Sequence, residues 1–272
     1  MTISAIEGLR ANHEDLQAVL ASVTDAEWAQ DSACAGWRIQ DVLAHVTSNF
    51  KEMIEPTPPP ADPPQVPSMT AEQAMEVLVA PRKEWTAAQL LAEYAQYRDA
   101  AFAALEALQA EPLASTETPL ADLGTYQLHW LANAYCFDHY CHLRHDLLAP
   151  EGPLQRDLPE PDDARLRPGV EWMWAGLPQM CSPALTHLDR PLLVVLTGPG
   201  GGSWLLGPAG ADGLITVEEV TGGAAPGAAA TVTSSAHAFV SWGTKRSNWR
   251  DHSTVTGDAD YAAAVLDALN IV

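Results

Sequence analysis

Apolar residues recur at intervals of three and four positions through the first half of the chain, which is the spacing of one face of a helix. This pattern predicts four helices, over 3–22, from near Ile39, over about 86–109 and over about 122–147. Because these long helices follow one another with no strand pattern between them, the first half is typical of an up-and-down four-helix bundle.

Three segments of the first half interrupt the helical pattern. Thr24 followed three positions later by Glu27 has the spacing of a capping box, and residues 32–37 are predicted to form a loop. The proline-rich segment 56–68 cannot continue a helix, because proline lacks an amide hydrogen and fixes φ. We expect this segment to form an extended, irregular insertion at the surface.

The character of the chain changes in the second half. Residues 149–168 are rich in Pro, Asp and Glu and are predicted to be a linker, and residues 169–186 are predicted to be helical. Short apolar runs of strand length follow, and then two more helical segments. The predicted strands are 191–196, 203–206, 213–217 and 229–234, and the predicted helices are 235–242 and 258–269.

Together these patterns predict an α+β protein. The expected organisation is a helical bundle over 1–150, a linker and helix over 151–186, and a small α+β domain over 187–272. The glycine run 198–202 has neither the GxxxxGK[ST] nor the GxGxxG spacing, so it favours a hairpin turn over a nucleotide-binding loop.

The charge balance excludes several classes of partner. The chain has 272 residues, with 14 Lys and Arg against 35 Asp and Glu and a formal net charge of −21. Such a surface repels nucleic-acid phosphates and anionic lipids, so we expect no nucleic-acid and no membrane partner. The sequence shows no signal-peptide pattern and no apolar run of membrane-spanning length. We expect a cytoplasmic protein with reduced cysteines, as a monomer or a homodimer.

The fourth predicted helix carries residue types that bind metals. Asp138 and His142 are four positions apart, so their side chains overlie on one helix face and can take adjacent positions on one ion. His45, on the second predicted helix, is the candidate for a third ligand, which leaves at least one metal position open. His145 continues the face of His142, and His139 with His142 is a weaker alternative pair. A polar, solvated helix face is the competing interpretation.

Two segments of the chain carry a recognisable family pattern. Residues 32–45 read SACAGWRIQDVLAH, in which Cys and then Gly-Trp precede a helix with D-V-L-x-H. Near the C-terminus, Trp242-Gly243, Lys245-Arg246 and Thr256-Gly257-Asp258 are followed by an amphipathic helix. Both segments resemble the mycothiol-dependent maleylpyruvate isomerase family, within the wider DinB-like superfamily. The resemblance implies a DinB-like, metal-binding four-helix bundle followed by a small C-terminal α/β domain.

The resemblance also implies the residues of the site. The metal ligands would be His45, Asp138 and His142, with Asp138 standing where the family usually has the longer glutamate. Arg246 is the best match to an arginine that the family places near the substrate. His145 would bind the metal itself or orient a ligand, and His145 or His139 would move a proton.

The function implied by this resemblance is thiol chemistry at a divalent metal, most simply zinc. Mycothiol or a similar low-molecular-weight thiol would bind the metal as cosubstrate and attack a small electrophilic substrate, in a cis–trans isomerase or a thiol S-transferase. Iron, nickel and manganese accept the same ligands. Two alternatives stay open: a metal-dependent hydrolase or lyase that works without a thiol, and a non-catalytic module that binds a small molecule.

Overall fold

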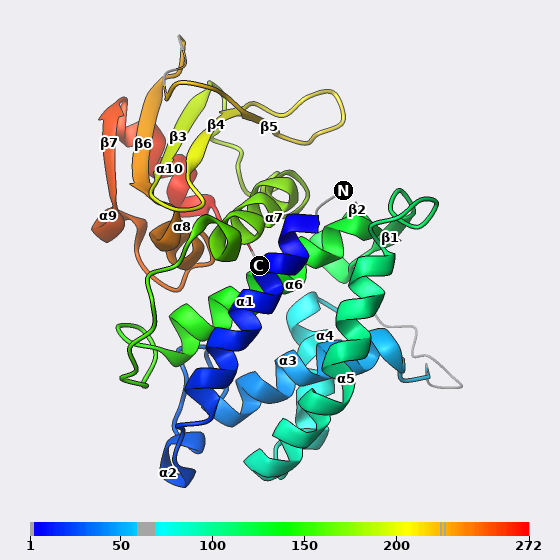
Figure 1. The fold of residues 1–272 in the computed structure, drawn as a ribbon. Helices are drawn as coiled ribbons and strands as arrows, with labels where there is room; N and C mark the ends of the chain where they lie inside the picture. The colour runs from blue at the N-terminus through cyan, green and yellow to red at the C-terminus, as the bar shows by residue number, and fades with distance from the viewer. Residues whose placement is uncertain (1–2, 59–68, 224, 226, 272) are drawn as a thin grey trace. The chain divides into compact units, whose positions relative to one another are not determined.

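The chain forms two compact units, Met1–Leu158 and Pro159–Val272, in the computed structural model (Figure 1). The structure describes residues 3–58, 69–223, 225 and 227–271. The domain boundaries 1–150, 151–186 and 187–272 are predicted from the sequence, and they stay a prediction. Most of the predicted insertion over 56–68 lies outside the described residues. Within the described ranges, every helix is too short or too polar to span a bilayer.

Four long helices dominate the first unit and pack in two pairs (Figure 1). Helix α1 (Ile3–Leu20) packs against α6 (Leu131–Cys141), and α3 (Ile39–Ile54) packs against α5 (Ala87–Ala107). Helices α1, α3 and α5 confirm the helices predicted over 3–22, from near Ile39 and over about 86–109. The shorter elements of this region are α2 (Asp25–Trp28), α4 (Ala71–Val79) and the 3₁₀ turn Ala80–Arg82, and α4 was not predicted.

Threonine caps fix where three of these helices begin. Thr24, Thr70 and Thr86 each accept a hydrogen bond from the backbone N–H three residues later, and the Glu or Gln at that position reaches back to the threonine N–H. Such reciprocal capping satisfies two backbone donors that the first helical turn leaves without partners. The capping box predicted at Thr24 is therefore confirmed.

The fourth predicted helix begins later than expected and ends in a different geometry. Strands β1 (Glu117–Pro119) and β2 (Thr125–Gln127) form an antiparallel hairpin, so the prediction of helix from residue 122 is wrong over the first turns. Gly124 explains the break, because its φ of 116° lies outside the helical region and is open mainly to glycine. After the 3₁₀ turns Ala121–Leu123 and Leu128–Trp130, α6 begins at Leu131 and continues into the π-helical turn His142–Leu147.

The core of the first unit contains an aromatic cluster that joins α3, α5 and α6. Phe50 and Tyr94 are fully buried. The Phe50 ring stacks on Tyr135 with centroids 5.7 Å apart, and it also contacts Tyr94, Phe102 and His139. Because packed aromatic rings tolerate little displacement, this cluster fixes the spacing of the helices that carry the candidate site.

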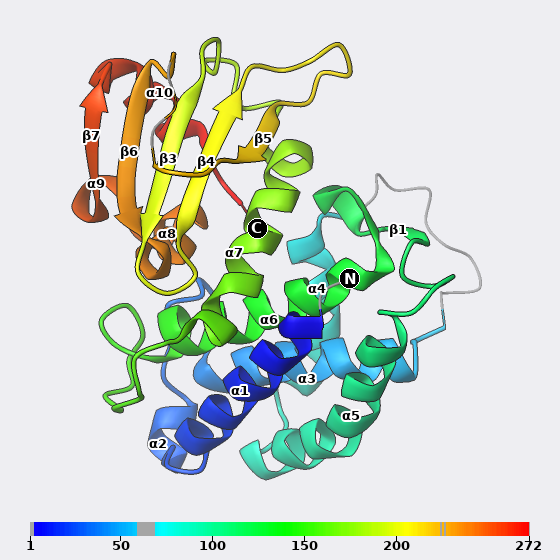
Figure 2. The ribbon, with the colours of Figure 1, turned by 45° about the horizontal axis from the view of Figure 1, so that its top comes forward.

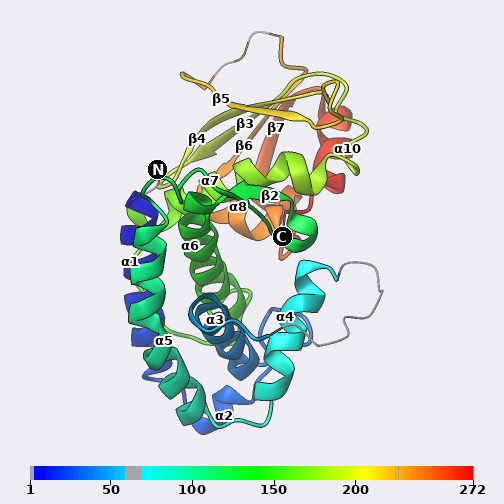
Figure 3. The same cartoon turned by 90° about the vertical axis from the view of Figure 1, so that its right-hand side faces the viewer.

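The second unit is a five-stranded sheet with helices along one face (Figures 2 and 3). The strand order is β5-β4-β3-β6-β7, with β3 and β6 parallel and the other neighbours antiparallel. The strands are β3 (Leu192–Thr197), β4 (Gly202–Gly207), β5 (Thr216–Glu219), β6 (Ala230–Ser235) and β7 (Ser253–Gly257). The helices are α7 (Asp163–Cys181), α8 (Ala236–Gly243), α9 (Trp249–His252) and α10 (Ala259–Ala268).

This unit confirms the α+β prediction, with differences in detail. The glycine run forms the β3–β4 hairpin as predicted, and Gly198 and Gly200 adopt the positive φ values of 76° and 72° that the turn requires. Helix α7 begins at Asp163, inside the predicted linker, and α9 and β7 were not predicted.

Candidate metal centre

His45 lies in the middle of α3, whose N-terminus is fixed by side-chain contacts. Arg38 donates hydrogen bonds from Nε and Nη2 to the Asp41 carboxylate, each at 2.9 Å, and Nη2 also donates to the Lys83 carbonyl oxygen. His45 follows Asp41 by one helical turn and is only 6% exposed. The start of α3 is thus held in place, and His45 is carried toward Asp138 of α6.

Three side chains from α3, α6 and the π-helical turn converge at one point. Asp138 Oδ1 lies 2.9 Å from His45 Nε2 and 3.3 Å from His142 Nε2. The three potential ligand atoms all lie within 4.8 Å of one another, and the two imidazole centroids are 4.9 Å apart. The structure therefore brings together the three residues that the sequence proposes as metal ligands.

Two polar side chains lie beside the imidazole rings of this cluster. His142 Nδ1 lies 2.7 Å from Oδ2 of the fully buried Asp146. A carboxylate only accepts, so Nδ1 carries a proton and the neutral ring has its lone pair on Nε2. Asn49 Nδ2 lies 3.3 Å from His45 Nε2, so the ring nitrogen that faces Asp138 also faces a side-chain amide. Both rings therefore present Nε2 toward Asp138, where each Nε2 can hold a proton or a metal ion.

This arrangement has the properties of a cation site. When deprotonated, the two Nε2 atoms and Asp138 Oδ1 are all electron-pair donors, so positive charge has to lie between them, as protons or as a metal ion. Asp138 Oδ2 is also buried, with no hydrogen-bond partner among the described residues. Burying a carboxylate oxygen without a hydrogen bond costs free energy, and a bound cation would offset that cost. Two imidazole nitrogens and a carboxylate oxygen fit zinc and also iron, nickel or manganese.

The pKa values show the same preference for positive charge. Burial opposes ionisation of Asp138, yet the adjacent His45 and His142 rings hold its pKa well below its usual value. Burial also opposes protonation of His142, but Asp138 and Asp146 outweigh it and raise the pKa of His142 to about 9. A proton and a metal ion therefore compete for His142 Nε2, so we expect metal affinity to fall as the pH falls.

Trp37 closes one side of the cluster. Its ring centroid lies 5.1 Å from that of His45 and 6.4 Å from that of His142. The indole N–H donates to Glu76 Oε2 at 2.8 Å, so a side chain of α4 holds this ring in place. The Asp138 side chain keeps 19% of its surface exposed, which leaves the cluster in contact with solvent.

Of the other two predicted site residues, His145 lies outside this cluster and Arg246 belongs to the other unit. His145, in the π-helical turn, is 1% exposed, with Nδ1 3.9 Å from Glu151 Oε2 and its ring 6.1 Å from that of Tyr140. Arg246 belongs to the second unit, where its backbone N–H donates to the Ser241 carbonyl. Catalytic roles for His145 and Arg246 stay predictions.

His139, the alternative partner of His142, has both ring nitrogens engaged elsewhere. Nδ1 donates to the Tyr135 carbonyl and Nε2 accepts from the Tyr94 hydroxyl, both at 3.0 Å. Tyr94 in turn accepts from His13 Nδ1 at 2.7 Å. Burial lowers the pKa of both His13 and His139 to about 4, so the chain His13–Tyr94–His139 carries neutral rings near pH 7.

Sequence reasoning missed three neighbours of the cluster. Asp146 follows His142 by four residues and Asn49 follows His45 by four, so the spacing that identified Asp138 could have found both. No local spacing indicates that Trp37 packs beside two histidines.

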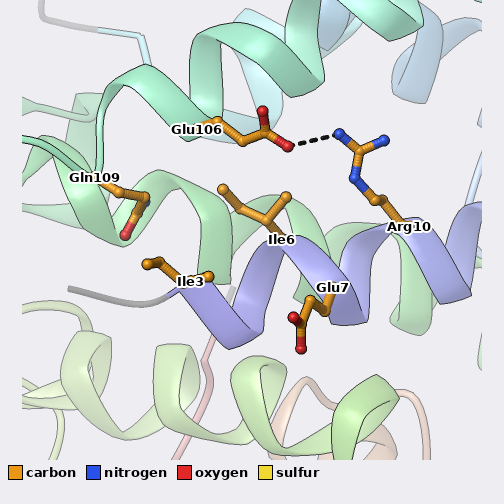
Figure 4. Close-up of a pocket in the computed structure, with 6 residues that line it drawn as sticks. All are labelled: Ile3, Ile6, Glu7, Arg10, Glu106 and Gln109. Atoms are coloured by element: carbon orange, nitrogen blue, oxygen red, sulfur yellow. Dashed lines mark hydrogen bonds and ion pairs between the residues drawn. The ribbon is translucent and has the colours of Figure 1, made fainter.

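A shallow pocket of about 370 Å³ lies elsewhere on the first unit (Figure 4). Residues of α1 and of the C-terminal end of α5 line it: Ile3, Ile6, Glu7, Arg10, Glu106 and Gln109. Arg10 and Glu106 form an ion pair at 2.7 Å across it, with both side chains about half exposed, and such pairs contribute little to stability. These six lining residues include no histidine, cysteine or hydroxyl group. The cluster of His45, Asp138 and His142 is therefore the better candidate for a catalytic site.

Replacing Asp146 with asparagine is expected to weaken zinc binding about 10- to 100-fold, because such outer partners orient a ligand and raise its basicity. Asparagine keeps the size of the side chain but removes the charge that fixes His142 Nδ1–H. Zinc affinity is measured by competition with a chromophoric chelator. Asp15→Asn is the matched control, since Asp15 is another buried carboxylate of this unit and pairs with Arg144 at 3.0 Å. Unchanged affinity in Asp146→Asn would contradict the orienting role.

Comparisons with known proteins agree with this architecture. A family model described as the mycothiol maleylpyruvate isomerase N-terminal domain matches residues 9–145, just over half of the chain. Two solved structures, of the mycothiol-dependent maleylpyruvate isomerase and of a histidine-to-alanine mutant of it, each match with a TM-score of 0.55 and 16% identity. Each match covers 93% of this chain and 91% of the other. A search of curated proteins finds no match. At this identity the two structures establish a shared fold.

Proposed function

Because this chain belongs to the mycothiol maleylpyruvate isomerase family by its N-terminal domain, we propose that it is a metal-dependent enzyme that uses a low-molecular-weight thiol. Mycothiol or a close analogue is the cosubstrate, and the substrate is a small electrophile. The reaction is a cis–trans isomerisation or an S-transfer. The observation that carries the proposal is the convergence of His45, Asp138 and His142 within 4.8 Å.

The proposed ligands provide what thiol chemistry requires. A divalent ion held there would supply a Lewis acid that lowers the pKa of a bound thiol. His45 and His142 are neutral donors and Asp138 carries one negative charge, so the three ligands leave a divalent site with net positive charge. That charge favours an anionic thiolate over the neutral thiol. The buried rings of His45 and His142 lie in a medium less polar than water, which strengthens this electrostatic preference.

Substrate binding is the part of the proposal that depends on the second unit. Arg246 is proposed to hold a substrate carboxylate, since a guanidinium binds a carboxylate through two parallel hydrogen bonds. The neighbouring Lys245 is less suited to this role, because its ammonium donates to the carbonyl oxygens of Leu266 and Asp267 at the end of α10. His145 is proposed to support the π-helical turn that carries His142.

Dependence on both metal and thiol tests the function. The zinc-loaded protein is assayed against cis-unsaturated carboxylic acids and other small electrophiles, with and without mycothiol. We expect turnover only when metal and thiol are both present. Turnover that is independent of thiol would instead indicate a metal-dependent hydrolase or lyase. Less than ~0.1 equivalent of bound metal after zinc addition would contradict every enzymatic interpretation of this site.

A further inference from the structure

Asn49 places a side-chain amide beside the proposed metal ligands. It follows His45 by one turn of α3, so both side chains lie on the same helix face, and its Nδ2 lies 3.3 Å from His45 Nε2. The Asn49 backbone carbonyl accepts a hydrogen bond from the Tyr135 hydroxyl at 3.0 Å, which ties this turn of α3 to the helix that carries Asp138. The backbone of Asn49 is thus tied to α6, and its side-chain amide lies beside His45 at the edge of the cluster.

A metal ion bound by His45 Nε2 would occupy the one lone pair that this nitrogen could offer to the amide. The lone pair of His45 Nε2 cannot serve both an ion and the Asn49 N–H. Zinc sites with three protein ligands keep a further position for an exogenous group. That group could then accept the hydrogen bond from the Asn49 amide. Hydrogen bonds from N–H donors to anions are roughly twice as strong as those between neutral groups.

We propose that Asn49 binds the anion at the open metal position by donating an N–H hydrogen bond to it. Asn49 is then a binding residue of the reaction and neither a fourth metal ligand nor a packing residue. The proposal rests on the metal-dependent function above, but it does not depend on the thiol, because any anion at that position accepts the same hydrogen bond.

The test uses the cobalt-substituted full-length protein, with β-mercaptoethanol and azide as probes and the visible absorption of the bound cobalt as the readout. Asn49→Leu keeps the side-chain size and removes the donor. We expect its cobalt dissociation constant to stay within about threefold of the wild-type value, while both probes bind about tenfold more weakly. Asn49→Asp is expected to weaken both probes further, because a carboxylate repels the anion.

Ser48→Ala is the matched control, since the Ser48 hydroxyl donates to the His45 carbonyl in the same turn of α3. It should leave probe binding unchanged. Unaltered probe binding in Asn49→Leu would overturn the proposal, and so would a parallel loss of cobalt and probe affinity. If the wild-type protein binds cobalt and azide but no thiol, the thiol function fails and azide still decides the role of Asn49. If it binds no cobalt, both proposals fail.

Discussion

Replacing His45 with alanine is expected to lower zinc affinity at least ~1,000-fold and to abolish turnover, while the first unit stays folded. Loss of a partner that only orients a ligand already costs about 10- to 100-fold, and His45 would be a ligand itself. Its loss leaves Asp138 and His142, which belong to one continuous helical segment, without the donor from α3. Zinc affinity is measured by chelator competition, and folding by circular dichroism and thermal melting in the presence of a chelator.

His129→Ala is the control for this experiment. His129 is a partly buried histidine of the same unit, and its Nδ1 lies 2.9 Å from the Ala114 carbonyl oxygen, away from the cluster. We expect this variant to bind zinc like the wild type. Wild-type zinc affinity in the folded His45→Ala variant would refute the ligand assignment, whatever the activity of the protein.

The sequence predicts the members of the cluster better than it predicts their surroundings. Asp138 and His142 follow from helical spacing within one segment. His45 lies 93 residues from Asp138, and no local spacing encodes a contact at that separation. His45 was a candidate by its residue type and its place on the second predicted helix, and the family pattern ending in D-V-L-x-H supported it. The contact between Trp37 and Glu76 is equally non-local, and it depends on α4, which was not predicted.

The elements that escaped prediction share weak local signals. Strands β1 and β2 have three residues each, too few for an alternating pattern to emerge. Strand β7 reads STVTG and lies at the edge of the sheet, where only one neighbour pairs with it. The long helices were predicted because each repeats its apolar face over several turns.

The shorter side chain of Asp138, where the family usually has glutamate, does not prevent the cluster from forming. Asp138 Oδ1 lies within 3.3 Å of both histidine nitrogens, so α3 and α6 approach closely enough for an aspartate to reach. The aromatic cluster around Phe50, which contacts Tyr135 and His139 of α6, holds the two helices at this spacing. Asp138 therefore reaches both histidine nitrogens without the additional methylene of a glutamate.

His13, at one end of the buried hydrogen-bond chain His13–Tyr94–His139, makes the free energy of unfolding depend on pH. Burial, reinforced by the charges of His139 and Arg98, lowers the pKa of His13 to about 4 from 6.5. Between these two values the unfolded chain binds a proton that the folded protein excludes. The stability linked to His13 is therefore complete above pH 6.5 and is lost as the pH falls toward 4. The loss reaches about 3 kcal/mol at pH 4, because each pKa unit corresponds to about 1.4 kcal/mol.

His13→Asn removes this titration and keeps an N–H donor near the position of Nδ1. Compared with the wild type in the presence of a chelator, we expect the variant to be less stable at pH 7.5, because the ring no longer packs on Tyr94 and Phe102. Its free energy of unfolding should then fall less between pH 7.5 and 4, by about 3 kcal/mol, in urea titrations at each pH. His187→Asn, at an exposed histidine, should follow the wild-type profile. If the pH profile of unfolding free energy for His13→Asn runs parallel to that of the wild type, His13 has the same pKa in the folded and unfolded states. The conclusion that His13 is neutral in the buried chain His13–Tyr94–His139 would then be wrong.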